Sequence, residues 1–355
     1  MRISIIGGGN LGTYMACSFA NKGHDVNIIT SRPKDFSKKL KIYSEDENLI
    51  SEGKISLATD NMKDGIENSQ IIFITVPPQL FSVTAQKLEP LIKNDQLIGI
   101  VPGAGGAEFA FKKIINRGVI FFGFARVPTI ARLKEYGKSV YMLGEAPELL
   151  IGSIPSNNAS MICDNIKELF DMTCLPVPNY LNVSFTPSNP ILHTTRIYSM
   201  FKDYIPGNYY PRNELFYEEW SIDAGKLLLD CSDELQYLCK AIPLDLRYVE
   251  SMQSRHNART PEELSNRICN IDRLKGLYSP VIKEKKGYVP DFNSRYFVSD
   301  FPLGIKIIIE IAKLFDVETP NMNMIWSWYE KVQPNNISNS FALNTSVDDF
   351  IKLYE

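Results

Sequence analysis

Histidine is scarce in this chain of 355 residues, with His24, His193 and His256 as its three copies, and none of them lies at the spacing of a metal ligand set. The six cysteines are scattered without a C-x-x-C pair, at positions 17, 163, 174, 231, 239 and 269. Such a pattern argues against a zinc site and against a disulfide framework. The sequence therefore predicts reduced thiols and no bound metal.

A strong charge of one sign and a long hydrophobic run are also lacking. The net charge of −3 provides no positive field of the kind that a nucleic-acid surface needs. No apolar run reaches the roughly 18 residues that span a bilayer, and the apolar first twenty residues carry four glycines with only Arg2 as a basic flank. We expect a cytoplasmic protein without nucleic-acid or membrane partners. The oligomeric state stays open, a homodimer included.

Short apolar runs alternate with longer segments in the N-terminal half. Runs that are apolar on both faces are typical of a parallel sheet covered by helices, and they occupy residues 2–7, 25–30, 71–76, 97–101 and 119–124. Segments 10–22 and 79–93 are long enough for crossover helices. This spacing predicts a doubly wound α/β Rossmann domain over residues 1–183. Within it we expect residues 139–155 to extend the sheet, followed by a helix over 157–171 and a strand over 175–185.

Helical spacing replaces the strand pattern after about residue 184, which predicts a mainly α-helical second domain over residues 184–355. A polar stretch at 283–296 interrupts this pattern as a connection that we expect to face solvent. The segments with helical spacing are 190–203, 214–240, 244–255, 261–273 and 302–315.

A G-x-G-x-x-G motif, formed by Gly7, Gly9 and Gly12, follows the first strand and opens a helix. In a dinucleotide site the first glycine permits the tight turn, the second lets the backbone approach the pyrophosphate, and the third lets helix and strand pack closely. The amides at the helix start supply a positive end for phosphate. Asn10 and Leu11 lie inside this motif and are candidate cofactor contacts too. A glycine-rich turn without a ligand is the alternative.

The end of the second strand indicates which dinucleotide binds. An NAD site usually has an acidic residue there, whereas this chain has Ser31 and Arg32, with no acid before Asp35. A guanidinium holds a 2′-phosphate with two charge-assisted hydrogen bonds. We therefore predict that NADP(H) is preferred, with NAD(H) as a possible cofactor. Arg32 stacking on adenine without a phosphate contact is the alternative.

Two later loops follow strands of the predicted sheet, where the nicotinamide and the substrate should lie. Residues 76–79 contribute Pro77, and residues 101–111 contribute Gly103, whose bare backbone could face the ring. An ordinary Gly/Pro turn explains both loops equally well.

His193 lies one turn inside a predicted helix that starts at Asn189 and Pro190. The positive end of that helix disfavours imidazolium, so a histidine that exchanges protons there needs a carboxylate partner. Asp300 is the most suggestive candidate. The alternatives are plain helix caps, with Asn189 capping the first helix rather than contacting substrate and Asp300 capping a helix over 301–315.

The chain resembles the opine dehydrogenases, the group that includes octopine dehydrogenase and N-(1-carboxyethyl)-norvaline dehydrogenase. The resemblance extends through most of the chain, although relatives often have proline where this chain has Thr194. It rests on the glycine motif, RVPTIARLKEYGKSVYMLG (126–144), NPILHTTRIY (189–198), FYEEWS (216–221), SDE (232–234) and RYFVSDFPLG (295–304) running into FDVETPNMN (315–323).

This resemblance implies a Rossmann domain followed by a helical domain, in an enzyme that joins the amine of an amino acid to a 2-oxo acid. NAD(P)H then reduces the linked imine. By position, the resemblance makes His193 the catalytic acid and base, Asp300 the residue that orients it, and Arg295 the residue that holds the oxo-acid carboxylate.

Two other functions compete with this one. A 2-oxo acid reductase of the ketopantoate reductase or hydroxyacid dehydrogenase type would share the first domain, but such enzymes generally use a lysine in the second. A non-catalytic NADP(H)-binding sensor would keep the fold and lack turnover.

Overall fold

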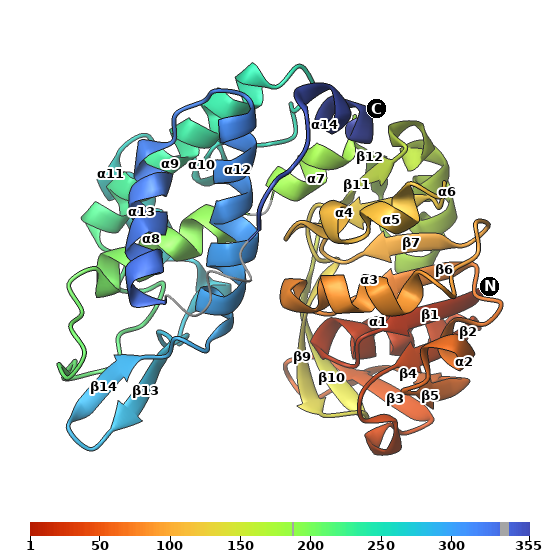
Figure 1. Ribbon diagram of the computed structural model, residues 1–355. Coiled ribbons are helices and arrows are strands. Elements are labelled where there is room, and N and C mark those ends of the chain that lie inside the picture. Colours follow the sequence, from red (N-terminus) through yellow and green to blue (C-terminus); the bar gives the residue numbers. More distant parts are fainter. Residues whose placement is uncertain (187, 334–340) are drawn as a thin grey trace. The chain divides into compact units, whose positions relative to one another are not determined.

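The computed structural model describes residues 1–186, 188–333 and 341–355. They form two compact units, Met1–Thr186 together with Ile351–Glu355, and Pro187–Phe350 (Figure 1). The sequence-based division into 1–183 and 184–355 differs from this, because the last five residues pack with the first unit. Tyr354 is 1% exposed there, and its hydroxyl donates a hydrogen bond to Glu108 at 3.0 Å.

An eight-stranded sheet forms the centre of the first unit, in the order β12-β11-β8-β7-β6-β1-β2-β5. Neighbouring strands are parallel except for β8 and β11, which are antiparallel. The predicted Rossmann-like parallel sheet is therefore confirmed. Its strands are β1 (Arg2–Ile6), β2 (Asp25–Ile29), β5 (Leu57–Thr59), β6 (Ile71–Ile74), β7 (Leu97–Ile100), β8 (Phe121–Phe124), β11 (Leu149–Ile154) and β12 (Cys174–Pro176).

The helices of the first unit follow most strands, as a doubly wound fold requires. They are α1 (Asn10–Asn21), α2 (Met62–Ile66), α3 (Phe81–Leu88), α4 (Ala107–Ala110), α5 (Lys112–Ile115), α6 (Ala159–Phe170) and α7 (Tyr180–Phe185). The strand predicted over 175–185 is wrong beyond Pro176. Asn179 accepts a hydrogen bond from the backbone N–H of Asn182 and so starts α7 as an N-cap.

A second sheet of four strands packs on α1, and the sequence did not predict it. It contains β4 (Leu49–Lys54), β3 (Lys39–Tyr43), β10 (Ser139–Glu145) and β9 (Thr129–Glu135), in that order. Of residues 139–155, β11 extends the main sheet as expected, whereas β10 pairs with β3 and β9 instead. Residues 146–148 separate the two strands, which allows them to enter different sheets.

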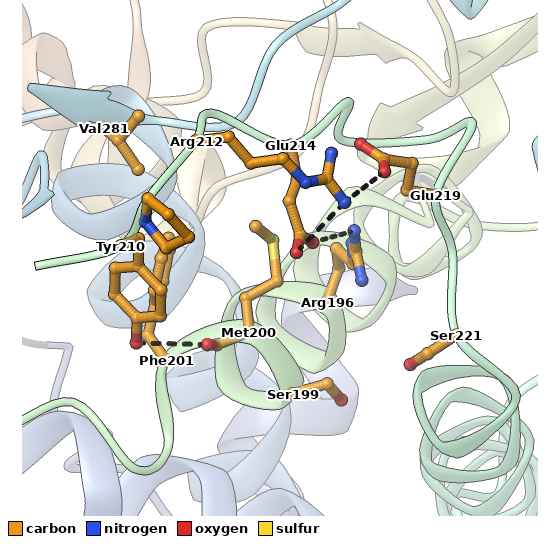
Figure 2. Close-up of a pocket in the computed structure, with 11 residues that line it drawn as sticks. Arg196, Ser199, Met200, Phe201, Tyr210, Arg212, Glu214, Glu219, Ser221 and Val281 are labelled. Carbon is orange, nitrogen blue, oxygen red and sulfur yellow. Dashed lines mark hydrogen bonds and ion pairs between the residues drawn. The ribbon is translucent and has the colours of Figure 1, made fainter. Parts of the chain in front are cut away.

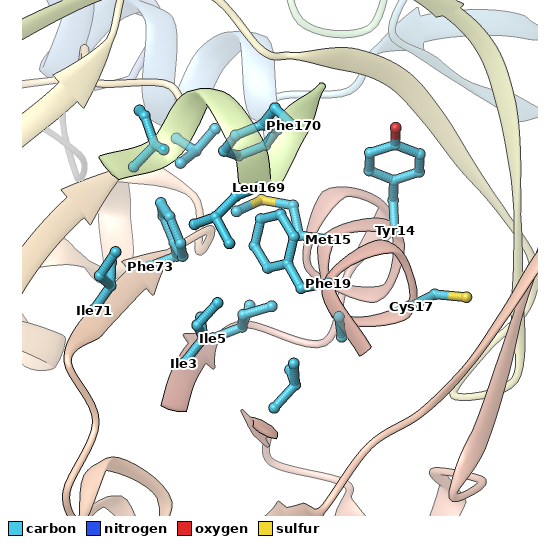
Figure 3. Close-up of a cluster of buried hydrophobic side chains, with 14 of the residues drawn as sticks. Ile3, Ile5, Tyr14, Met15, Cys17, Phe19, Ile71, Phe73, Leu169 and Phe170 are labelled. Carbon is cyan, nitrogen blue, oxygen red and sulfur yellow. The ribbon is translucent and has the colours of Figure 1, made fainter. Parts of the chain in front are cut away.

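Helix α1 lies between the two sheets, and its side chains form the core on both sides (Figure 3). Towards the main sheet, Phe19 contacts Phe73 and Phe170 with ring centroids 5.6 and 5.1 Å apart. Each of these rings is at most 8% exposed, and burying a side chain of this size contributes about 1.5–3 kcal/mol. This packing fixes α1, whose N-terminus carries the glycine motif.

The second unit is mainly helical, as predicted. Its helical segments are α8 (Asn189–Phe201), α9 (Ile222–Ala241), α10 (Met252–His256), α11 (Pro261–Cys269), a π-helix (Tyr296–Ile305), α12 (Lys306–Leu314) and α13 (Pro320–Val332), and α14 (Val347–Tyr354) ends in the first unit. Two of the expected helices are too long. The helix expected over 214–240 begins only at Ile222, because Ser221 caps α9. Residues 244–251 are not helical, since Pro243 follows the end of α9 and Ser251 caps α10. The polar stretch at 283–296 contributes to a hairpin of β13 (Val281–Glu284) and β14 (Gly287–Pro290).

The described residues were also considered as membrane-spanning helices and as metal ligands. None of their helices is long and apolar enough to cross a membrane. No group of three or more His, Cys, Asp or Glu side chains among them could hold a metal ion.

Glu108 is a fully buried carboxyl group in α4 of the first unit, with 0% of its surface exposed. One of its oxygens, Oε1, accepts hydrogen bonds from the hydroxyls of Ser184 at 2.6 Å and Tyr354 at 3.0 Å. The other oxygen, Oε2, has no hydrogen-bond partner among the described residues. Burial raises the pKa of Glu108 from 4.5 to about 7, so the fold favours its protonated form.

We predict that this carboxyl group makes stability depend on pH. A carboxyl group whose pKa is raised on folding contributes its full stabilisation below about pH 4.5, the pKa in the unfolded chain. As the pH rises from there to about 7, the free energy of unfolding should fall by about 3 kcal/mol. Glu108→Gln should flatten the unfolding free energy between pH 4.5 and 8, as measured by urea denaturation. Glu148→Gln, which changes an exposed carboxylate, is the control. Equal pH slopes for wild type and Glu108→Gln would contradict the prediction.

Candidate active site

The glycine motif forms the turn between β1 and α1. Gly7 has a φ of +124°, a backbone conformation that other residues rarely adopt. A Cβ on Gly12 would lie 1.9 Å from the carbonyl oxygen of Gly7, whereas a Cβ on Gly9 would meet nothing within 4 Å. The chain itself therefore requires glycine at positions 7 and 12. At position 9 the space beside the backbone is free, and a pyrophosphate needs such space to approach closely. These residues therefore fit a dinucleotide.

Asn10 and Leu11 are held by the protein around them. The Asn10 side chain accepts a hydrogen bond from the backbone N–H of Leu133 at 2.8 Å. Leu11 is partly buried and packs against the core cluster. A cofactor contact by either residue stays a prediction.

Arg32 lies over an aromatic ring that the sequence did not indicate. Its guanidinium carbon is 3.6 Å from the ring centroid of Tyr136, whose hydroxyl is 2.9 Å from Oγ1 of Thr30. Asp35 pairs with Arg32 at 3.8 Å, and 59% of the Arg32 side chain remains exposed. Ser31 is exposed beside it. Arg32 is thus held by a stacking contact while its charge stays accessible to a ligand.

The two later loops differ in character. Pro77 is exposed and precedes a short 3-10 turn, Pro78–Leu80. Gly103 is buried, and a Cβ there would lie 2.5 Å from Val183 and 2.9 Å from the hydroxyl of Tyr180. Packing against α7 therefore accounts for this glycine, and its contact with the cofactor stays a prediction.

The structure brings His193 and Asp300 together in the second unit. Nδ1 of His193 lies 2.8 Å from a carboxylate oxygen of Asp300, although 107 residues separate them in the sequence. The imidazole is 3% exposed and the carboxylate 18%. Because an ionised carboxylate only accepts hydrogen bonds, the proton of the neutral ring is on Nδ1 and Nε2 carries the lone pair.

Asp300 is not a helix cap, contrary to one of the alternatives. It lies inside the π-helical segment Tyr296–Ile305, which runs directly into α12. Pro302 within that segment has no N–H to donate, and the backbone departs from helical angles at Leu303. Single π-helical turns are frequent at functional sites, and this one directs the Asp300 carboxylate to His193.

Tyr217 is the site residue that sequence reasoning did not assign. Its hydroxyl lies 2.9 Å from Nε2 of His193, so both ring nitrogens are engaged. Tyr217 lies in the motif FYEEWS (216–221), which forms a turn ahead of α9. Burial raises the pKa of Tyr217 well above its ordinary value, so this hydroxyl stays protonated.

The two proposed substrate residues lie at the starts of the helices that carry the pair. Arg295 is exposed and directly precedes the π-helix, with its guanidinium carbon 5.2 Å from the ring centroid of Tyr296. Asn189 is exposed and is the first residue of α8 rather than its cap. The cap position belongs to Ser188, because its carbonyl oxygen accepts the hydrogen bond from the N–H of Leu192 at 2.8 Å.

A cavity of about 430 Å³ lies further along α8 and does not include His193 or Asp300 (Figure 2). Its charged groups neutralise one another. Arg212 pairs with Glu219 at 2.6 Å and with Glu214 at 3.7 Å, and the buried Arg196 pairs with Glu214 at 3.4 Å. The sequence did not indicate this cavity, and its balanced charges give no preference for an anion or a cation.

Comparison with known proteins matches both parts of the chain. The family model described as NAD/NADP octopine/nopaline dehydrogenase, alpha-helical domain, matches residues 176–333. The model described as NAD-dependent glycerol-3-phosphate dehydrogenase N-terminus matches residues 2–112. Tauropine dehydrogenase from Arabella iricolor is 27% identical over 364 residues, covering 93% of this chain and 91% of the relative.

Solved structures of octopine dehydrogenase share the fold. The complex with NADH and L-arginine superposes with a TM-score of 0.85 at 19% identity, covering 99% of this chain and 98% of that one. The complex with NADH and pyruvate gives a TM-score of 0.80 at 20% identity, covering 93% and 88%. The resemblance predicted from the motifs and the two-part fold are thereby confirmed.

Two alanine variants should separate the roles of the glycines. Gly12→Ala forces a Cβ against the Gly7 carbonyl, and we expect a loss of about 1–3 kcal/mol in the unfolding free energy, since overpacking typically has such a cost. Gly9→Ala meets no protein atom within 4 Å. It should keep the stability of wild type but raise the Kd for NAD(P)H by about tenfold, which corresponds to ~1.4 kcal/mol. Denaturation and fluorescence titration measure the two quantities. Unchanged cofactor binding in a folded Gly9→Ala would remove the pyrophosphate role of this loop.

Proposed function

We propose that this chain is an NAD(P)-dependent oxidoreductase of the opine dehydrogenase type, which acts on CH–NH groups, and that it catalyses the following reaction. The amine of an amino acid condenses with a 2-oxo acid, and NAD(P)H reduces the resulting imine to a secondary amine. The observation that supports this reaction is the contact between the buried His193 and the partly buried Asp300, 2.8 Å apart.

Condensation needs a base, because an amino acid near pH 7 is mostly an ammonium ion that cannot attack a carbonyl. His193 accepts that proton on the Nε2 side while Asp300 holds Nδ1–H and stabilises the imidazolium that forms. The same proton is returned when the hydroxyl of the addition product leaves as water. General acid–base help of this kind contributes about 10²–10⁴-fold, and the carboxylate fixes the tautomer as in other His–Asp pairs.

The remaining residues position the reactants. Arg295 holds the oxo-acid carboxylate with its exposed guanidinium, and Asn189 lies at the start of the helix that carries His193. Gly9 and the first amides of α1 receive the pyrophosphate, with Pro77 and Gly103 in the loops beyond the neighbouring strands. Reduced nicotinamide, when bound, supplies the hydride that the imine carbon accepts.

NADPH is the preferred cofactor in this proposal. An exposed arginine replaces the acidic residue that usually follows the second strand in NAD sites. The stack on Tyr136 covers one face of the Arg32 guanidinium, and the N–H groups at its edge donate to a 2′-phosphate. Ser31 adds a hydroxyl donor beside it.

A screen for NADPH oxidation, crossing several 2-oxo acids with the common amino acids, tests the function. Pyruvate with L-arginine is the first pair to try, since a related enzyme was solved with each of them. Mass spectrometry of the product should detect a secondary amine. Equal rates with and without the amino acid would instead favour a 2-oxo acid reductase, and cofactor binding without turnover of any pair would favour a sensor.

We predict that His193→Asn lowers kcat for the productive pair by about 10²–10⁴-fold while the Kd for NADPH is unchanged. Asparagine keeps a polar side chain of similar reach but cannot take up a proton. Stopped-flow rates and fluorescence titration on the same preparation measure the two effects. A loss of less than threefold would exclude His193 as the acid and base.

Arg32→Ala should lower the ratio of kcat/KM for NADPH over NADH by about 10- to 100-fold, since a charge-assisted contact contributes about 1.5–3 kcal/mol. Lys34→Ala, a neighbouring exposed cation, is the matched control. A ratio that Arg32→Ala leaves unchanged would support stacking on adenine, which serves both cofactors alike.

A further inference from the structure

Both nitrogens of the His193 ring are already engaged inside the protein. Nδ1 contacts Asp300 at 2.8 Å and Nε2 contacts the Tyr217 hydroxyl at 2.9 Å. Since Nε2 carries the lone pair of the neutral ring, Tyr217 donates its proton to it. The ring is also 3% exposed. A substrate therefore cannot reach the basic nitrogen without either displacing Tyr217 or using it.

Displacement of Tyr217 would disturb a well-packed cluster. Its ring is 6% exposed, stacks with Trp220 at 14° and 6.5 Å, and meets Phe216 edge-on at 4.9 Å. The backbone beside it is fixed as well, because Nε of the buried Arg196 donates to the carbonyl oxygen of Phe216 at 3.0 Å. These contacts hold the hydroxyl against His193.

The contacts continue from Tyr217 towards the surface. The ring of Tyr296, which is only partly buried, meets the His193 ring edge-on at 4.8 Å and stacks with Phe216, the neighbour of Tyr217, at 4.9 Å. The exposed guanidinium of Arg295 lies 5.2 Å from the Tyr296 ring centroid. Asp300, His193 and Tyr217 are thus joined by hydrogen bonds, and Tyr296 lies between the His193 ring and the residue that we propose as the carboxylate anchor.

We propose that the Tyr217 hydroxyl is a proton relay between His193 and the substrate. When the ammonium group gives its proton to the Tyr217 oxygen, the phenolic proton moves to Nε2, leaving a neutral amine, an unchanged tyrosine and an imidazolium. When the hydroxyl of the addition product leaves, the same two protons move back and water forms. No oxidant or reductant takes part in either transfer.

The inference rests on the proposed function, and Tyr217→Phe tests it by removing the hydroxyl alone. We expect kcat at pH 7 to fall by about 10- to 100-fold, within the range of general acid–base effects. Part of this loss should be recovered as the pH approaches 9.5, where the amino acid supplies neutral amine without help. Asp300, Tyr296 and Arg295 are the other ionisable groups around the relay and are unchanged in the variant. A purely structural defect would persist at every pH.

Tyr210→Phe is the matched control, because it also removes a tyrosine hydroxyl of the second unit, in this case a partly buried one that donates to the carbonyl oxygen of Met200. It should keep the activity of wild type. Wild-type activity in Tyr217→Phe, or a loss that does not change with pH, would overturn the relay. Inactivity of wild type with every substrate pair would overturn the proposed function, and the relay with it.

A measurement on wild type covers the case in which Tyr217→Phe does not fold. The relay moves two protons in each transfer, so the rate of condensation in mixtures of H₂O and D₂O should curve with the deuterium fraction. A straight line would mean that one proton moves and would contradict the relay.

Discussion

The hydrogen bond between Nδ1 of His193 and Asp300 is the constraint on which the site depends. It joins two helices far apart in the sequence, α8 and the π-helix, and it decides which ring nitrogen carries the proton. A buried polar pair of this kind stays in place only when its partners are satisfied. Tyr217 satisfies the remaining nitrogen, so the whole group is kept in one arrangement.

The predictable part of the fold was the part with a strong local pattern. Strands such as Ile71–Ile74 are apolar on both faces, and only a sheet covered on both sides buries them. The second sheet had no such signal, because strands like Lys39–Tyr43 bury one face against α1 and expose the other. Segment 175–185 was predicted to be a strand because its apolar run is short. In the structure the Asn179 side chain caps a helix that begins at Tyr180.

Motifs and chemical reasoning predicted the main residues of the site, but not the side chains that contact them. Gly7 and Gly12 could be predicted because backbone geometry alone demands glycine there. His193 and Asp300 needed the family resemblance, since nothing local links residues 107 positions apart. Tyr217 and Tyr136 were missed for a related reason. An aromatic residue in a polar turn has no periodicity, and only the fold shows what its hydroxyl or its ring face meets.

The return of residues 351–355 to the first unit makes the second unit an insertion within the first, since both of its ends are joined to that unit. Domains generally fold as units during synthesis. Here the pocket around Glu108 stays incomplete until the whole inserted unit has left the ribosome and Tyr354 can dock. The first unit is therefore the first to be translated and the last to be finished.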